Sequence, residues 1–514
     1  MKLRALAFVL LSAGCAAKAA PPPSFAAETA KADALRSEGC YTCLKEALSI
    51  YERQLTLKAP PGDAAAKAFD TALLIAIREK DLGIPAEESL TRARRLVIPS
   101  RSVLLDAAEL IVGETSGLDP EQRALVTGRN RPALGMDNPR RRALDALPPV
   151  DVTAKYVALT IDCEQQKLIE SVDLKALTAV YAGVQLMQFR LATCGRPAGP
   201  DVSQLRASDA RWTDTLYWEG RRELVASLGQ AIDFSKALGF FGQGREAFPP
   251  SLTLAMAWSN VNLSGEEFAA ALSGFDEVLA KYPTHRDALN GRMQSLSYLQ
   301  RHDEAIATAT RMLELGTWHL SDANYWRAWN RYQIKQYDDA WVDVENAAKG
   351  LSNARVHMLA GLIAYARKEL PTAVERFDRA FAVDASACDA VWMSGLVSID
   401  QNELAIAAPK FARGMTCFTS SAAALRADLQ RYEDTLARRG TPANARDQRQ
   451  MDRLRRDADN AEEKSAQSAF NGAQCYARTG NQALALNLVD VAMGHPAMKE
   501  KATALRAAIE KLPN

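Results

Sequence analysis

Small residues recur along the middle of this 514-residue chain at intervals close to 34 residues. Five alanines mark the period, with spacings of 34, 35, 33 and 34 residues: Ala271, Ala305, Ala340, Ala373 and Ala407. The best copies add an aromatic residue four positions later and a small residue seven positions later, as in Ala373, Phe377 and Ala380. Another small residue recurs twelve positions before the alanine, at Ala328, Gly361 and Gly395. Such a period indicates a repeat architecture, in which each unit stacks on its neighbours to build a continuous core.

This pattern resembles the tetratricopeptide repeat, a 34-residue helix-turn-helix unit. Small residues suit the crossing of two antiparallel helices, because only Ala or Gly lets the backbones approach closely. The aromatic residue is expected to fill the gap to the next repeat. A sixth copy lies apart, with Ala473, Ala485 and Ala492 in matching positions. The resemblance implies an all-α fold: a right-handed tetratricopeptide solenoid with a less regular helical N-terminal half.

Composition shifts and the repeat divide the sequence into seven segments. We expect a signal peptide or lipoprotein signal at 1–19, an N-terminal helical region with a diverged repeat at 20–127, a Pro- and Gly-rich linker at 128–151, a helical region at 152–250, five repeats at 251–420, a helical hairpin with solvated charges at 421–467, and a sixth repeat with a capping helix at 468–514. Residues 156–161 are the one plausible strand, but a lone strand is rarely stable, so the class stays all-α. The glycines between 239 and 244 are interpreted as a turn into the repeats.

The first residues predict export. Lys2 and Arg4 precede an apolar run at 5–13, which is too short for a bilayer that needs about 20 residues. The run ends in Gly14 and Cys15, which resembles a bacterial lipoprotein signal in which Cys15 receives the lipid. Ala17 and Ala19, on either side of Lys18, offer an ordinary A-x-A cleavage site instead. We therefore expect a protein of the bacterial cell envelope, either lipid-anchored at the outer membrane and facing the periplasm, or soluble in the periplasm.

Export makes disulfides possible. The register places Cys388 at the start of the first helix and Cys417 at the end of the second helix of one repeat. These points lie at the same end of an antiparallel pair, so the sequence predicts a disulfide between them. Cys40 and Cys43 precede a helix, and their spacing fits a structural disulfide, inert thiols, a redox pair or a metal-ligand pair. Cys475 is expected to be the unpaired thiol.

Charge and motifs give no indication of catalysis. The 63 basic and 62 acidic residues leave a net charge of +1, without the concentrated positive field that nucleic-acid binding needs. The sequence contains no phosphate-binding loop, no zinc-protease motif and no nucleophile elbow. We expect no enzyme, no cofactor, no metal and no nucleic-acid partner.

The resemblance implies that the first helix of each repeat lines a concave groove. The register places six aromatic residues there: Tyr298, Tyr325, Trp329, Tyr332, Tyr365 and Trp392. Aromatic side chains offer large contact area at low entropic cost, so we expect a protein or peptide partner in the groove, and membrane contact through the N-terminal lipid only. Two alternatives stay open. The aromatic residues pack between repeats, or Trp329 and Trp392 bind sugar rings in a glycan- or nutrient-capturing lipoprotein.

Overall fold

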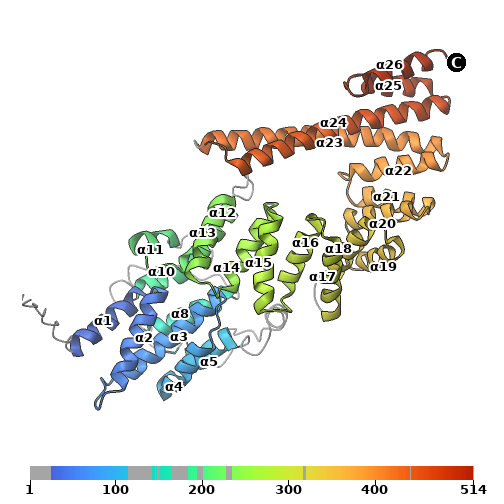
Figure 1. Ribbon diagram of the computed structural model, residues 1–514. Helices are drawn as coiled ribbons and strands as arrows, with labels where there is room; N and C mark the ends of the chain where they lie inside the picture. The colour runs from blue at the N-terminus through green and yellow to red at the C-terminus, as the bar shows by residue number, and fades with distance from the viewer. Residues whose placement is uncertain are drawn as a thin grey trace, which may run out of the picture. The chain divides into compact units, whose positions relative to one another are not determined.

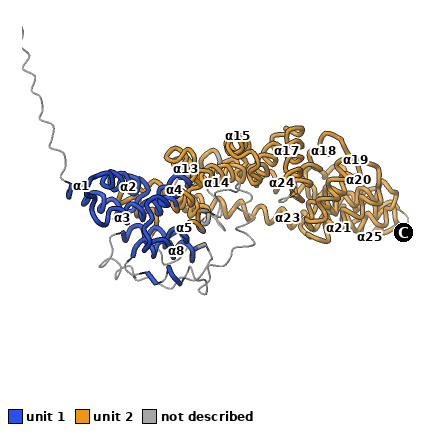
Figure 2. Tube along the Cα trace, turned by 90° about the horizontal axis from the view of Figure 1, so that it is seen from below, with its two compact units in different colours: residues 1–76, 87–108, 135–200 blue, residues 77–86, 109–134, 201–514 orange. Residues whose placement is uncertain are grey.

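The computed structural model describes residues 25–113, 142–144, 146–147, 151–164, 183–193, 201–226, 234–316, 320–439 and 442–512. The regular structure of these residues is entirely helical (Figure 1). The chain forms two compact units, one of residues 1–76, 87–108 and 135–200, the other of residues 77–86, 109–134 and 201–514 (Figure 2). The expected signal with Cys15 and most of the expected linker at 128–151 lie outside the described residues.

Short helices precede the repeats. They are α1 (Phe25–Glu38), α2 (Tyr41–Leu55), α3 (Ala64–Leu82), α4 (Glu87–Leu96), the 3-10 turn η1 (Pro99–Arg101), α5 (Ser102–Gly113), α8 (Val152–Glu164), α10 (Val184–Thr193), α11 (Val202–Ser208), α12 (Thr215–Ala226) and α13 (Phe234–Ala247). In the first unit, Asp70 accepts hydrogen bonds from the guanidinium groups of Arg36 and Arg101, and Arg101 also donates to Asp151 at 2.6 Å. This partly buried ion network ties α1, α3 and the start of α8 together.

The possible strand at residues 156–161 is part of α8. Tyr156 and Ile161 are buried, and the Thr160 hydroxyl accepts a hydrogen bond of 2.7 Å from Arg190 Nε on α10. A strand preference is realised only where a neighbouring strand is present to pack against. Residues 156–161 pack against a helix instead, so they are helical.

The glycines between 239 and 244 do not form a turn, because they lie inside α13. A Cβ atom on Gly244 would come within 2.7 Å of the Leu254 side chain in α14 (Leu252–Ser264). A Cβ atom on Gly220 would meet the Phe241 ring at 2.5 Å. Gly220 and Gly244 thus allow α12, α13 and α14 to pack closely. Reading glycine as a turn residue does not predict this role.

Six antiparallel helix pairs follow in the order that the period predicts. They are α14 with α15 (Phe268–Lys281), α16 (Arg286–Tyr298) with α17 (His302–Leu315), α18 (Leu320–Gln333) with α19 (Tyr337–Ala348), α20 (Ala354–Ala366) with α21 (Leu370–Val383), α22 (Cys388–Asp400) with α23 (Leu404–Arg439), and α24 (Ala445–Arg478) with α25 (Gln482–Met493). The six alanines of the pattern, at 271, 305, 340, 373, 407 and 485, are all completely buried. The fold is an all-α solenoid of the tetratricopeptide-repeat type, and α26 (Lys499–Ile509) covers its last pair.

The turn between the two helices of each pair repeats one backbone feature. A residue five positions before each alanine has a positive φ: Glu266 (61°), Gln300 (59°), Lys335 (64°), Lys368 (66°), Asn402 (63°) and Gly480 (80°). Only the sixth copy uses glycine, the residue that adopts this conformation without strain. The other five copies hold ordinary side chains in the left-handed region because the pairing of the two helices fixes the turn.

The recurrent aromatic residue packs partly within its own repeat. Phe377 is completely buried, and a Cβ atom on Gly361 would lie 2.5 Å from its ring. The same ring belongs to a cluster that includes Val397 of the next repeat. The expectation that the aromatic fills the gap between repeats is therefore incomplete. It also fills the space that the small residue leaves at the crossing of its own two helices.

The charged hairpin is an extension of the repeats. α23 runs for 36 residues and α24 for 34 residues, so the expected boundaries at 420 and 468 both fall inside continuous helices. The facing sides of the two helices form an apolar seam of Leu429, Tyr432, Leu436, Met451 and Leu454. Only the outer faces of the hairpin carry solvated charge, because an isolated pair of helices needs its own core. Among the described residues, no helix has the length and apolar character needed to cross a membrane.

Candidate functional site

A cavity of about 550 Å³ lies between the inner helices of repeats three to five and the hairpin. The repeat side contributes mainly apolar groups: Tyr325 and Trp329 from α18, and Met358 and Leu362 from α20. The hairpin side contributes Phe418 and Leu425 from α23, and Asp457, Asn460 and Lys464 from α24. The cavity therefore has one aromatic wall and one mixed wall, which is typical of sites that bind another molecule.

Helical geometry explains the aromatic wall. Tyr325, Trp329 and Tyr332 are spaced four and three residues apart, so they form one stripe along α18. Ala323 and Ala328 are completely buried on other faces of this helix. Trp326 is also buried, with its ring centroid 5.5 Å from that of Tyr325 in an edge-on contact. The buried faces hold α18 in place, and the stripe stays half-buried at the edge of the core.

Burial favours the neutral phenol of Tyr325, and a neighbouring charge opposes it. Burial raises the pKa of Tyr325, while the neighbouring Arg355 acts in the opposite direction. The Arg355 guanidinium lies 5.4 Å from the centroid of the Tyr325 ring, within the range of a cation–π contact. This arginine lines the cavity and is itself exposed, so it brings a positive charge to the aromatic wall.

Two of the six aromatic residues named from the sequence line this cavity. Tyr325 and Trp329 line the cavity, and Tyr332 is half-buried with its ring centroid 6.4 Å from that of Trp329. Tyr298 is 51% exposed and stacks on Phe268 at 4.4 Å. The Tyr365 hydroxyl donates a hydrogen bond of 2.8 Å to Asp400.

Trp392 lies at the edge of the same region. Its half-buried ring faces Lys464 Nζ, which is 5.8 Å from the ring centroid. Its Nε1 atom is buried and has no acceptor among the described residues. Lys464 also forms an ion pair with Asp389, which fixes α24 to the first helix of repeat five.

The polar side chains that line the cavity differ in whether they already have hydrogen-bond partners within the chain. Asp384 accepts hydrogen bonds from the Ser386 hydroxyl and amide, and the bond from the hydroxyl contributes most to the lowered pKa of this carboxyl group. The side chains of Asp457 and Asn460 form no hydrogen bond or ion pair with the described part of the chain. Both therefore present free acceptors, and Asn460 also a free donor, to whatever enters the cavity.

Sequence reasoning missed the hairpin side of the cavity. It assigned the hairpin charges to solvent and therefore did not consider Asp457, Asn460 and Lys464 as lining residues. Phe418 and Leu425 carried a usable signal, because apolar residues seven apart mark one face of a helix. Nothing in the sequence, however, indicates that this face turns toward α18 and α20, since that depends on the path of the hairpin.

Cys388 and Cys417 form a disulfide at the border of the cavity. Their Cα atoms are 5.5 Å apart, and the bond joins the start of α22 to the middle of α23. Cys475 is buried and is the free thiol of the described residues, and burial raises the pKa of this thiol.

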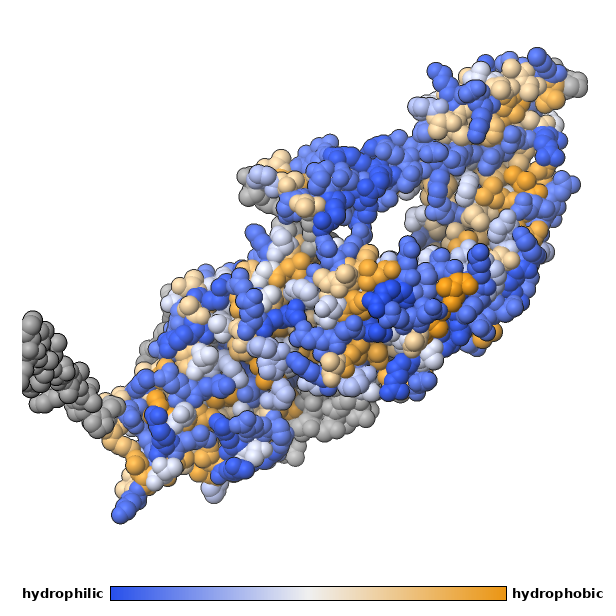
Figure 3. Space-filling model, in the orientation of Figure 1, coloured by the Kyte–Doolittle hydropathy of each residue, from blue (hydrophilic) through white to orange (hydrophobic). Residues whose placement is uncertain are grey.

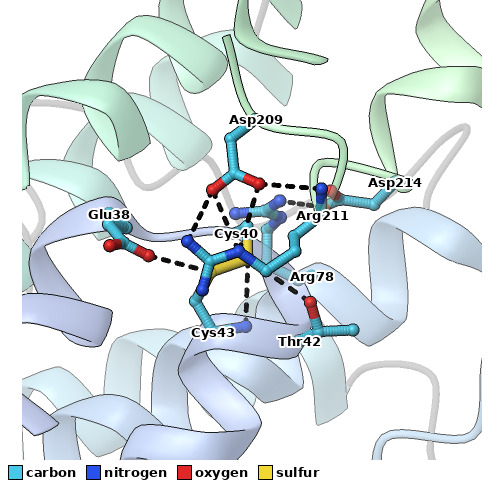
Figure 4. Close-up of a disulfide and its surroundings, with 8 residues drawn as sticks. All are labelled: Glu38, Cys40, Thr42, Cys43, Arg78, Asp209, Arg211 and Asp214. Carbon is cyan, nitrogen blue, oxygen red and sulfur yellow. Dashed lines mark hydrogen bonds and ion pairs between the residues drawn. A yellow bond between two sulfur atoms is a disulfide. The ribbon is translucent and has the colours of Figure 1, made fainter. Parts of the chain in front are cut away.

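Cys40 and Cys43 also form a disulfide (Figure 4). Cys40 is completely buried and Cys43 is 1% exposed. The Cys43 amide donates to Cys40 Sγ at 3.0 Å, so the motif caps the N-terminus of α2. A buried bond of this kind is shielded from attacking thiolates, which favours the structural alternative over the redox alternative. Sulfurs joined to each other are also not the thiolates that a metal binds, which disfavours the metal alternative.

Comparison with known proteins yields helical repeat proteins of low similarity. No family model and no curated relative matches the chain. Among solved structures, MamA from Desulfovibrio magneticus RS-1 is 22% identical over 32% of this chain and 94% of its own, with a TM-score of 0.31. YrrB, a TPR protein with an unusual peptide-binding site, is 16% identical over 34% of this chain and 91% of its own, with a TM-score of 0.30. A tetratricopeptide repeat protein from Parabacteroides merdae is 12% identical over 58% of this chain and 100% of its own, with a TM-score of 0.33. These values give no basis for transferring a function.

Proposed function

We propose that this protein is a non-enzymatic scaffold that binds a polypeptide partner between the inner helices of its repeats and its hairpin. The observation that carries the proposal is the cavity of about 550 Å³ with Tyr325 and Trp329 on one wall. Half-buried aromatic side chains at the edge of a cavity gain contact area without having to unfold their surroundings. Such residues commonly dominate the energy of protein binding.

A displayed library of random twelve-residue peptides tests the proposal. Peptides selected on the full chain are measured by calorimetry against the wild type and against Trp329→Ala. Truncation of a central aromatic anchor costs about 2 kcal/mol or more, so we expect affinity to fall by about 30-fold or more. Far-UV circular dichroism should stay unchanged, because Trp329 is only half-buried.

Trp341→Ala is the matched control. Trp341 lies in the second helix of the same repeat, packs under Arg367 and Arg376, and does not line the cavity. It should bind the selected peptides like the wild type. Equal losses in both variants, or lower helical content in Trp329→Ala, would show that Trp329 supports the fold and not a partner.

We also propose that the scaffold works in the bacterial cell envelope, anchored by a lipid on Cys15. The basic residues and apolar run before Cys15 support this placement. The Cys40–Cys43 and Cys388–Cys417 disulfides support an oxidising compartment. Cys15→Ser should move the protein from the membrane fraction to the soluble fraction, while Cys475→Ser should not. Soluble wild-type protein that begins at Ala20 would refute the lipid anchor.

A further inference from the structure

We infer that the hairpin is a strap that closes the groove, so that the site receives an extended polypeptide segment and excludes a folded domain. The inference rests on the proposed function and specifies the kind of partner. It depends on two sets of contacts, one that closes the hairpin onto the first repeat and one that forms the walls of the cavity.

The first set of contacts makes the groove a closed ring. At its base the hairpin is continuous with the helices of repeats five and six. Near its far end, Arg449 and Arg453 of α24 form ion pairs with Glu267 and Glu266 in the turn between α14 and α15. The hairpin therefore spans repeats two to four and is fixed at both ends. Figure 3 shows openings between the hairpin and the repeats.

The strap has its own core and can move as one rigid body. Its apolar seam includes Tyr432, whose hydroxyl donates a hydrogen bond of 2.9 Å to Asp447. The Asn444 amide donates to the Asp447 carboxylate, and the Asp447 amide donates to the Asn444 side-chain oxygen, both at 3.0 Å, which forms a reciprocal cap at the start of α24. When the ring opens, we therefore expect the strap to move as a unit and to break its ion pairs with Glu266 and Glu267.

Those contacts are weak enough to open. The four side chains of the two ion pairs are between 39% and 62% exposed. Exposed ion pairs contribute little to stability and are screened by salt. A partner can therefore reach the cavity in two ways. A free chain end can thread through the closed ring, or the partner can bind while the strap is open.

The second set of contacts favours an extended chain. A peptide in extended conformation presents unpaired backbone N–H and C=O groups, whereas a helix or a folded domain has already paired them. On the strap side of the cavity, Asp457 offers hydrogen-bond acceptors to these backbone groups, and Asn460 offers both a donor and an acceptor. Tyr325, Trp329 and Met358 on the opposite wall receive an apolar side chain of the same segment.

Threading can be tested with one peptide in two forms. The first form is a free peptide from the Trp329-dependent selection, and the second is the same sequence placed between two copies of a small folded domain. Glu266→Cys and Arg453→Cys, joined by a flexible bis-maleimide in the full chain, staple the strap shut. Cys475 is buried and stays unmodified. The control is the same double variant with both cysteines blocked by N-ethylmaleimide.

We expect the stapled protein to bind the free peptide with an affinity close to that of the control. The flanked peptide should associate with the stapled protein at least about 100-fold more slowly than with the control, because neither end can thread. Equal binding of the two forms to the stapled protein would overturn the inference, and so would failure of the staple to form. Absence of any Trp329-dependent peptide would instead refute the proposed function.

A charge swap tests the ion pairs without the staple. Arg449→Glu with Arg453→Glu should speed association of the flanked peptide by about tenfold, because the strap opens more often. Adding Glu266→Arg and Glu267→Arg should return the rate toward that of the wild type. An unchanged rate in the first variant would show that these pairs do not hold the strap.

Discussion

Replacing Gly361 by alanine should destabilise its repeat, whereas replacing Gly239 should stabilise its helix. Both glycines lie inside helices, α20 and α13, where alanine gains about 1 kcal/mol over glycine from backbone entropy. At Gly239 a Cβ atom meets nothing within 4 Å, so the gain of about 1 kcal/mol should appear in full. At Gly361 the Cβ atom would lie 2.5 Å from the ring of Phe377.

The size of the Gly361 effect follows from the surroundings of the ring. Phe377 is completely buried and cannot swing into solvent, so the two helices must separate slightly. Overpacking of this kind costs about 1–3 kcal/mol. After the helix gain of about 1 kcal/mol, the repeat should lose roughly 0–2 kcal/mol, and the two substitutions should differ by about 1–3 kcal/mol.

Hydrogen exchange measured by mass spectrometry is the suitable assay, because a long repeat protein does not unfold as one two-state unit. Amides in α20 and α21 should exchange faster in Gly361→Ala, and amides in α13 should exchange more slowly in Gly239→Ala. Adding Phe377→Leu to Gly361→Ala should recover part of the loss, since the two sites are in contact. Slower exchange in α20 and α21 of Gly361→Ala would refute the assignment of Gly361 to the helix crossing.

Three further changes test other parts of the fold. Lys335→Gly should stabilise repeat three by roughly 0.5–1 kcal/mol, because it removes a side chain from the left-handed region, and exchange in α19 should slow. Gly480→Ala should cost repeat six about 1 kcal/mol, and exchange in α25 should speed up. Faster exchange in α19 or slower exchange in α25 would contradict this. Asp343→Ala should lower the stability of repeat three by about 3–5 kcal/mol, because Arg327 and Arg331 lose the fully buried carboxylate that accepts from both. Hydrogen exchange in α18 and α19 should therefore become faster. Replacing the exposed Asp339 of the same helix by alanine should cause no comparable increase. Joint replacement of Cys388 and Cys417 by serine should lower the stability of repeat five by about 3–4 kcal/mol on the chain-entropy model, and thermal unfolding indistinguishable from the wild type would refute a stabilising bond.

The candidate site was only half predictable from the sequence. The stripe of Tyr325, Trp329 and Tyr332 follows from the repeat register, because spacings of three and four residues define one face of a helix. The opposite wall with Asp457, Asn460 and Lys464 does not follow from any local pattern. Its residues lie more than 100 positions later in the chain and read as an ordinary charged helix face.

The repeat itself was determined by the sequence alone. Alanine or glycine at fixed spacing admits one close helix crossing per 34 residues, and this local requirement produces the antiparallel pairs, their order and the buried alanines. The strand-like residues 156–161, the glycines of α13 and the course of the hairpin were decided by tertiary structure. In each case the same local sequence suits two conformations, and contacts with residues distant in the chain select between them. Helix α10 covers α8, Leu254 packs on Gly244, and Glu266 and Glu267 hold the far end of the hairpin.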